Sequence, residues 1–125
     1  MRIVIIGYGS IGRRHAEVIS KNFKNVQLHI CTKQILKKYK YFQKLSFIKN
    51  LKPDYVIIAS ETHKHFKILK YLENNLKKYD LVIVNDFGHG LLTKKIRKYL
   101  QKFSKYLALN CQTNSSNNGY NFITK

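Results

Sequence analysis

The chain has 125 residues and carries 24 lysine and arginine residues against 6 acidic ones, a formal net charge of +18. Its apolar share of 44% is typical of a globular protein and excludes global disorder. No apolar run approaches the roughly 20 residues that a membrane-spanning helix requires, and the amino-terminal apolar run is too short for a signal peptide. Cys31 and Cys111 form no CxxC motif, so we expect reduced thiols in a cytoplasmic protein.

The positive charge has two explanations. A field of this sign attracts nucleic acids and other polyanions without sequence preference. Alternatively, the abundance of Lys, Asn, Ile, Tyr and Phe reflects an A+T-rich coding composition. The lysines are spread along the chain rather than gathered into one basic arm, which favours the second explanation. Nucleic acid is therefore not the expected partner.

Short apolar runs that alternate with amphipathic segments predict an α/β fold. Strands are expected at residues 2–6, 26–31, 47–48, 55–59, 81–84 and 106–109, and helices at residues 10–22, 34–43, 62–73 and 91–103. The apolar stripes expected to face the core are Ile11, His15, Val18 and Ile19 on the first helix and Phe66, Leu69 and Leu72 on the third. This order predicts a single Rossmann-like domain over residues 1–125, a three-layer α/β/α arrangement with a mostly parallel sheet.

The first expected strand runs directly into Gly7-Tyr8-Gly9-Ser10-Ile11-Gly12. Strand, glycine-rich turn and helix, in that order, are typical of a dinucleotide-binding turn. Gly7 permits the tight turn, Gly9 lets the backbone approach a pyrophosphate, and Gly12 lets the helix pack closely on the strand. The free N–H groups at the start of the helix would face the phosphates. A glycine-rich turn that holds no ligand is the alternative.

Two segments carry a resemblance to a known family. Residues 7–15, GYGSIGRRH, resemble the start of the Gfo/Idh/MocA family of NAD(P)-dependent sugar oxidoreductases, and residues 53–65, PDYVIIASETHKH, resemble its Ala-Thr-Pro-Thr-x-x-His block. The resemblance covers residues 1–75, the dinucleotide-binding half. It implies that Gly7, Tyr8, Gly9, Ser10, Ile11 and Gly12 line the pyrophosphate. It also implies that Ala59, Ser60, Thr62 and His65 lie near the nicotinamide half.

The sequence departs from this family at three places. Where NAD users carry an acidic residue after the second strand, the chain has Thr32 and Lys33, which favour the 2′-phosphate of NADP unless the site is degraded. Glu61 replaces a proline and places a negative charge near the cofactor. The catalytic Glu-Lys-Pro motif and the substrate-binding sheet domain are missing, so no catalytic residue is assigned. The expected cofactor is NAD(P), with NADP slightly preferred.

The remaining residues, 76–125, resemble a different family. Residues 79–92, YDLVIVNDFGHGLL, and residues 107–121 are similar to a middle segment of PfkB-type (ribokinase-fold) sugar kinases related to heptose kinase/nucleotidyltransferases. The resemblance implies a strand-helix-strand extension with a polar tail, but the Gly-Ala-Gly-Asp anion hole of such kinases is absent. Asp86 and His89 follow a strand, where α/β proteins place ligands, although loop capping is the simpler role. Residues 82–84 are expected to take the place of the strand that would carry Glu-Lys-Pro.

The sequence therefore favours an NAD(P)-binding Rossmann domain of a sugar oxidoreductase, truncated and without complete catalytic machinery. A fragment of a carbohydrate kinase and a basic nucleic-acid-binding module are the alternatives. The expected partners are the dinucleotide, a sugar or sugar-nucleotide substrate and a second copy of the chain, with no membrane. His63 and His65 have no third ligand at a suitable spacing, so no metal site is expected.

Overall fold

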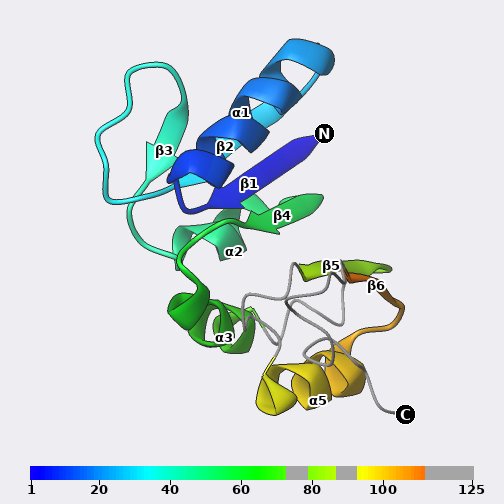
Figure 1. The fold of residues 1–125 in the computed structure, drawn as a ribbon. Helices are drawn as coiled ribbons and strands as arrows, with labels where there is room; N and C mark the ends of the chain where they lie inside the picture. Colours follow the sequence, from blue (N-terminus) through cyan, green and yellow to red (C-terminus); the bar gives the residue numbers. More distant parts are fainter. Residues whose placement is uncertain (73–78, 87–92, 112–125) are drawn as a thin grey trace, which may run out of the picture. The chain divides into compact units, whose positions relative to one another are not determined.

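The computed structural model describes residues 1–72, 79–86 and 93–111, and the chain divides into two compact units, Met1–Glu61 and Thr62–Lys125 (Figure 1). The side chains of residues 62, 85, 86 and 109–111 lie outside the described part. Each unit has its own sheet and its own apolar cluster. The single domain expected from the chain length stays a prediction.

The first unit is built on a four-stranded parallel sheet with the strand order β3-β2-β1-β4. β1 (Arg2–Ile6) lies between β2 (Gln27–Cys31) and β4 (Tyr55–Ile58), and β3 (Lys40–Phe42) pairs with the outer side of β2. The chain thus runs outward from β1 to β3 and returns to the other side of β1 at β4. This reversal of strand order is the Rossmann arrangement, and it confirms the predicted α/β fold with a parallel sheet.

The central strand supplies most of the core of this unit. All four apolar residues of β1 are buried: Ile3, Val4, Ile5 and Ile6. A continuous apolar run is expected here, because a parallel strand with a neighbour on each edge is covered on both faces of its sheet. On one face Ile3 and Ile5 pack with Ile30 of β2 and with helix α1 (Ser10–Asn22), which Figure 1 shows lying across the sheet.

Helix α1 has the predicted bounds but turns a different face to the sheet. Its buried residues are Gly12, Ala16 and Ile19. Three of the four residues predicted to face the core are exposed: Ile11, His15 and Val18. The helix must approach β1 closely at the glycine-rich turn, so small residues take the inner positions. The prediction was wrong because it counted large apolar side chains and passed over glycine and alanine.

Residues 34–51 differ from the prediction in two further ways. The helix predicted for residues 34–43 is a loop followed by β3, whose Lys40 pairs with His29 of β2. Leu36 and Tyr39 pack against the core cluster at a spacing of three, which also fits a helix and explains the error. The strand predicted at residues 47–48 is instead the start of a short helix, α2 (Phe47–Leu51).

The second unit contains α3 (Thr62–Tyr71), β5 (Val82–Asp86), α5 (Lys94–Phe103) and β6 (Leu107–Cys111). Within the described residues these elements confirm the two helices and two strands predicted for this part of the chain. The sequence predicts that residues 82–84 extend the main sheet. In the structure they pair in parallel with β6 in a two-stranded sheet, and α5 connects the two strands as one βαβ unit.

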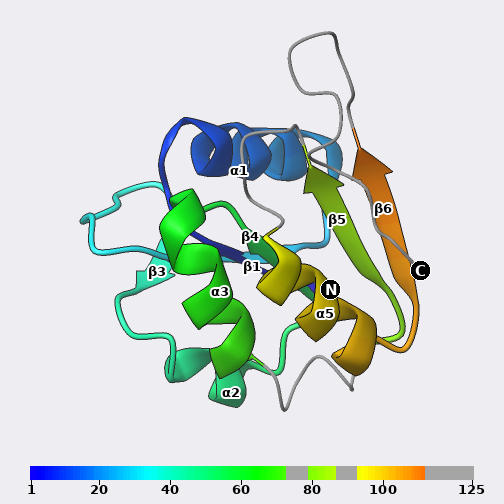
Figure 2. The same cartoon turned by 60° about the horizontal axis from the view of Figure 1, so that its bottom comes forward.

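The core of the second unit lies between its helices and this sheet. Ile96 and Leu100 of α5 are buried, and Phe66 and Leu69 of α3 pack against them together with Val82, Val84 and Leu107. Leu72, the last residue of the predicted stripe, is also buried. Thr93 caps α5, since its Oγ1 accepts a hydrogen bond of 3.3 Å from the N–H of Ile96. Figure 2 shows α3 and α5 side by side.

Among the described helices, none combines the length and apolar character needed to span a membrane.

Candidate functional site

The glycine-rich turn joins β1 to α1 in the first unit. Gly7 has a φ of +100°, in the left-handed region that favours glycine, and its N–H donates a 2.9 Å hydrogen bond to the carbonyl oxygen of Cys31. Gly9 is the N-cap of α1, and its carbonyl oxygen accepts a 2.9 Å bond from the N–H of Arg13. The N–H groups of residues 10–12 precede this bond and have no acceptor inside the helix.

The three glycines of the turn differ in the space around them. A Cβ on Gly7 would lie 2.6 Å from the carbonyl oxygen of Ala59 and 2.6 Å from the amide nitrogen of Ser60. A Cβ on Gly12 would collide with the carbonyl oxygen of Gly7. A Cβ on Gly9 would meet nothing within 4 Å. The fold itself therefore requires Gly7 and Gly12, whereas the open side at Gly9 fits the close approach of a pyrophosphate to the backbone.

The electrostatic surroundings of the turn favour an anion. The first turn of α1 contains no acidic residue, and the helix start carries a partial positive charge. Arg13 and Arg14 are exposed beside it. The guanidinium carbon of Arg13 lies 5.9 Å from the centre of the Tyr8 ring, so this positive group stays next to the turn.

The loop after β2 supports the turn through Tyr8. The ring of Tyr8 makes an edge contact with the ring of Tyr39 at a centroid distance of 6.2 Å. The backbone carbonyl oxygen of Tyr8 accepts a 3.3 Å hydrogen bond from Nε2 of Gln34. The N–H of Gln34 in turn donates to Oγ1 of Thr32 at 3.2 Å. Sequence reasoning missed Gln34 and Tyr39 as supports of the site. Both belong to the segment predicted as a helix, and neither lies in a recognisable motif.

Thr32 and Lys33 follow β2 at the carboxyl edge of the sheet, the same edge as the glycine-rich turn. Thr32 is half-buried and its N–H donates to the carbonyl oxygen of Phe42 at 3.0 Å, whereas Lys33 is exposed. The position after β2 is where the adenosine ribose binds in folds of this type. A hydroxyl and an ammonium group stand there in place of the usual carboxylate.

Ala59 and Ser60 follow β4 and lie against Gly7, as the Cβ distances above show. Both are half-buried, and the N–H of Ala59 donates a 2.8 Å bond to the carbonyl oxygen of Ile6. The structure therefore brings these two residues together with the glycine-rich turn at one edge of the sheet. Thr62 and His65 belong to the second unit, and their role near the nicotinamide stays a prediction. The side chain of Asp86 and all of His89 lie outside the described residues.

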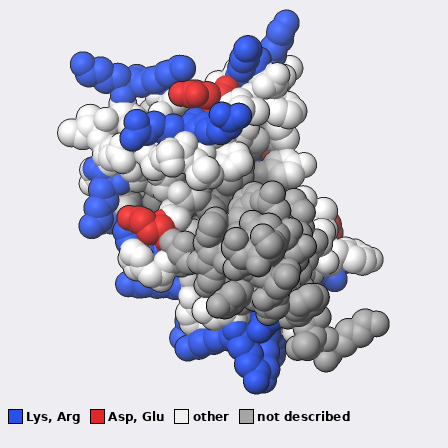
Figure 3. All heavy atoms as spheres, viewed as in Figure 1, with Lys and Arg blue, Asp and Glu red and all other residues white. Residues whose placement is uncertain are grey.

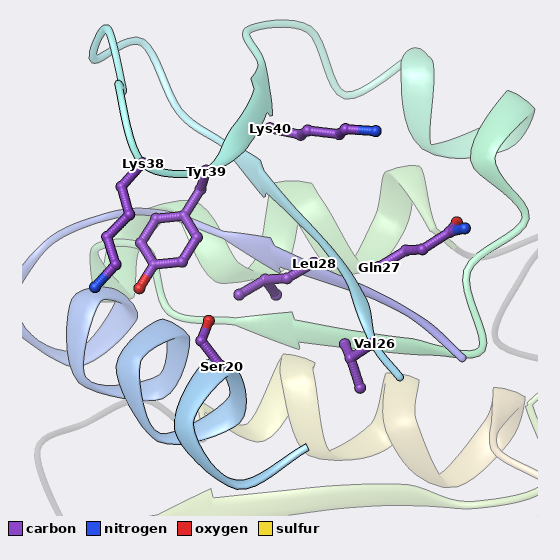
Figure 4. Close-up of a pocket in the computed structure, with 7 residues that line it drawn as sticks. All are labelled: Ser20, Val26, Gln27, Leu28, Lys38, Tyr39 and Lys40. Atoms are coloured by element: carbon purple, nitrogen blue, oxygen red, sulfur yellow. The ribbon is translucent and has the colours of Figure 1, made fainter. Parts of the chain in front are cut away.

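A surface cavity of about 430 Å³ lies elsewhere in the first unit, near the carboxyl end of α1 and the amino end of β2 (Figure 4). It is lined by Ser20, Val26, Gln27, Leu28, Lys38, Tyr39 and Lys40. The glycine-rich turn lies at the opposite ends of α1 and β2. None of the predicted site residues lines this cavity, so it is distinct from the candidate dinucleotide site.

Cys31 lies at the end of β2 and holds Gly7 through its carbonyl oxygen. Its side chain is buried, and this burial raises the pKa of the thiol from 9.0 to about 11. The thiolate is the form that reacts with alkylating reagents. Cys31 is therefore a structural residue of low reactivity.

We expect iodoacetamide to alkylate Cys31 at pH 8 about 100-fold more slowly in the native protein than in the unfolded chain, because burial raises the pKa of the thiol from 9.0 to about 11. The native rate should keep rising about tenfold per pH unit up to about pH 11, whereas the unfolded rate should level off near pH 9. Mass spectrometry of a Cys111→Ser variant isolates this thiol. Equal rates in both states would contradict the burial of Cys31.

Comparisons with known proteins bear on the whole of the first unit. A family model described as an oxidoreductase family with an NAD-binding Rossmann fold, GFO_IDH_MocA, matches residues 1–84. The match ends within β5, so it extends beyond residue 75, where the sequence-based resemblance ended. A search of curated proteins finds no match. These comparisons give no support to the sugar-kinase resemblance of residues 76–125.

Proposed function

This chain belongs to the Gfo/Idh/MocA oxidoreductase family with an NAD-binding Rossmann fold, and on that basis we propose that it binds a nicotinamide dinucleotide at the turn between β1 and α1. The observation that carries the proposal is the open backbone at Gly9, between two glycines that the fold itself requires. The pyrophosphate would accept hydrogen bonds from the free N–H groups at the start of α1. Arg13 adds a positive charge at the same place.

The two halves of the dinucleotide would lie on either side of this turn. The adenosine half extends toward Thr32 and Lys33, after β2, and the nicotinamide half extends toward Ala59 and Ser60, after β4. Both pairs follow strands that neighbour β1, at its carboxyl edge, where ligands bind in open parallel sheets. Gln34 and Tyr39 hold Tyr8 and so keep the turn in its binding geometry.

The dinucleotide supplies the hydride chemistry when it is bound, and the residues of this chain bind and orient it. Hydride transfer also needs a substrate held against the nicotinamide ring. The Glu-Lys-Pro motif that carries the family's catalytic lysine does not occur in the 125 residues. The proposed role of residues 1–125 is therefore cofactor binding, without complete machinery for a sugar or sugar-nucleotide substrate.

A fluorescence titration with NADPH and NADH at about 0.15 M salt tests the proposal, because long-range attraction by the net charge is screened beyond about 8 Å under these conditions. We expect saturable binding of both dinucleotides. Inorganic pyrophosphate should compete with them, because it occupies the same N–H groups. A signal that rises linearly with dinucleotide and does not saturate would exclude a working site.

The side chain at position 33 should decide between the two dinucleotides. We expect Lys33→Gln to weaken NADPH binding about 3- to 10-fold and to leave NADH nearly unchanged, because only NADPH carries a 2′-phosphate for the ammonium group to meet. Lys24→Gln removes the same charge from an exposed position after α1 and serves as the control. Equal weakening of NADPH and NADH by Lys33→Gln would show that this lysine does not contact the 2′-phosphate.

A further inference from the structure

Two helices described in the second unit, α3 and α5, carry a basic surface that is not visible in the linear sequence. We define the lysine face by six exposed residues of α3 and α5: Lys67, Lys70, Lys94, Lys95, Lys98 and Lys102. Neither helix contains an acidic residue. In the sequence the two groups of lysines are more than twenty residues apart, which favours a compositional explanation of the charge. Folding brings them onto neighbouring helices.

Direct contacts show that α3 and α5 are neighbours. The rings of Phe66 and Tyr99 meet edge to face at a centroid distance of 5.7 Å, and Nζ of Lys95 lies 4.7 Å from the centre of the Phe66 ring. The apolar residues of both helices pack into one cluster with β5 and β6. Because an amphipathic helix turns its polar side away from such a cluster, the lysines of both helices lie on the outer surface. Figure 3 shows lysine and arginine side chains projecting at the lower end of the view, where α5 lies.

This arrangement opposes helix stability in the absence of a partner. Lys94 and Lys95 occupy the first turn of α5, where the helix dipole disfavours cations. Lys98 stands four residues from both Lys94 and Lys102, and like charges at this spacing repel each other. A polyanion bound to this surface would remove the repulsion and release its own counterions.

We propose that the lysine face binds the phosphate backbone of double-stranded nucleic acid without reading its sequence. Lys94, Lys98 and Lys102 follow one another at about 6 Å along the axis of α5, which gives a row of positive charges. Lysine is a point charge on a flexible stem, and such groups neutralise phosphates rather than read base edges. The binding is independent of the dinucleotide site proposed for the first unit.

Two other polyanionic partners fit this surface less well. A single strand is held by several aromatic side chains that stack on successive bases. On these two helices the rings of Phe66 and Phe103 both pack against Tyr99, which leaves Tyr71 as the exposed ring. An anionic membrane is held by apolar side chains that enter the lipid. The isoleucine and leucine side chains of α3 and α5 instead contribute to the core and are buried or half-buried.

Fluorescence anisotropy of a short labelled DNA duplex tests the proposal on the full chain. We expect log Kd to depend on log salt with a slope of about 5 between about 50 and 200 mM salt, because each phosphate contact contributes about 0.9. The face variant replaces Lys67, Lys70, Lys94 and Lys98 with Gln. The control variant replaces four exposed lysines of the first unit with Gln: Lys21, Lys24, Lys37 and Lys44. Both lose the same net charge.

The face variant should bind the duplex at least about 30-fold more weakly, with the slope reduced by about 3 to 4, whereas the control variant should stay within about threefold of wild type. Glutamine is about as good a helix former as lysine, so far-UV circular dichroism should be unchanged. Acetylation footprinting of the wild-type chain gives a second readout that needs no variant. The duplex should protect the lysine face and leave Lys21 and Lys24 reactive.

Several results would overturn the proposal. Equal losses in the two variants would show that the duplex responds to the total charge and not to this surface. Uniform protection of all lysines in the footprint would mean the same. Tighter binding of a single strand, or of vesicles with anionic lipids, would assign the face to a different partner. Absence of duplex binding by the wild-type chain at about 50 mM salt would remove the basis for the proposal.

Discussion

Replacing Gly9 with aspartate should abolish saturable NADPH binding and leave the fold intact. A Cβ at this position meets nothing within 4 Å, and the backbone angles, φ −76° and ψ −163°, are accessible to any residue. Gly9 is also the N-cap of α1, where aspartate is a preferred residue. The new carboxylate would accept hydrogen bonds from the same N–H groups that the pyrophosphate needs. Its negative charge would also repel the negative charge of the pyrophosphate. We expect the Kd for NADPH to rise by at least about 100-fold.

The free energy of unfolding of this variant should stay equal to wild type or rise by a few tenths of a kcal/mol, because the helix gains a side-chain cap. Gly9→Asn is the matched control, since asparagine has the same shape and caps helices equally well but carries no charge. It should weaken NADPH binding clearly less than aspartate does. If the aspartate variant binds NADPH like wild type, the dinucleotide does not cross this turn and the proposed site is wrong.

The first βα unit could be predicted from the sequence because local rules and the tertiary fold agree there. A β-branched run that enters a glycine-rich turn specifies both β1 and the start of α1, and the structure has the predicted bounds for both. The inner face of α1 could not be predicted by counting apolar side chains. Close packing on the turn selects Gly12 and Ala16, which contribute little apolar area of their own.

The secondary structure of the segment between β2 and β4 could not be predicted from its local sequence pattern. Leu36 and Tyr39 have helical spacing, but β3 forms because it completes hydrogen bonds to the outer edge of β2. Pairing with a strand about ten residues away leaves no signal in the pattern of residues 34–43 itself. The same limit hid Gln34, whose contact with Tyr8 depends on a loop closing over the turn.

The geometry of the glycine-rich turn could be predicted from the sequence, whereas the binding role of the candidate site stays a prediction. Its central residues, Gly7 to Gly12, form one continuous motif, and their geometry follows from neighbouring positions. Ala59 and Ser60 were located only through a family resemblance, yet the structure places them against Gly7, where a Cβ would have no room. A site residue that follows another strand can be predicted when it belongs to a known family motif. Gln34 belongs to no such motif.

A second large effect is expected from Gly12→Ala, which should destabilise the first unit by about 3 kcal/mol. In an unconstrained helix this change would stabilise the protein by about 1 kcal/mol, because alanine is the better helix former. Here the added Cβ collides with the carbonyl oxygen of Gly7, a backbone atom of the turn itself. The helix must therefore move away from β1, and the buried contacts of Ala16 and Ile19 weaken with it.

Hydrogen exchange at the amides of Val4 and Ile5 measures this effect within the first unit, because these residues lie in its core strand. Gly9→Ala is the matched control, since it adds the same methyl group three residues earlier, where the space is open. Because alanine is a poorer N-cap than glycine, this control should lower stability by about 1 kcal/mol or less, well short of the effect of Gly12→Ala. NADPH binding should be lost in the Gly12→Ala variant through displacement of the turn. A stabilised Gly12→Ala variant would mean that α1 does not pack on the turn. It would contradict the conclusion that the fold requires Gly7 and Gly12 whereas Gly9 serves the ligand.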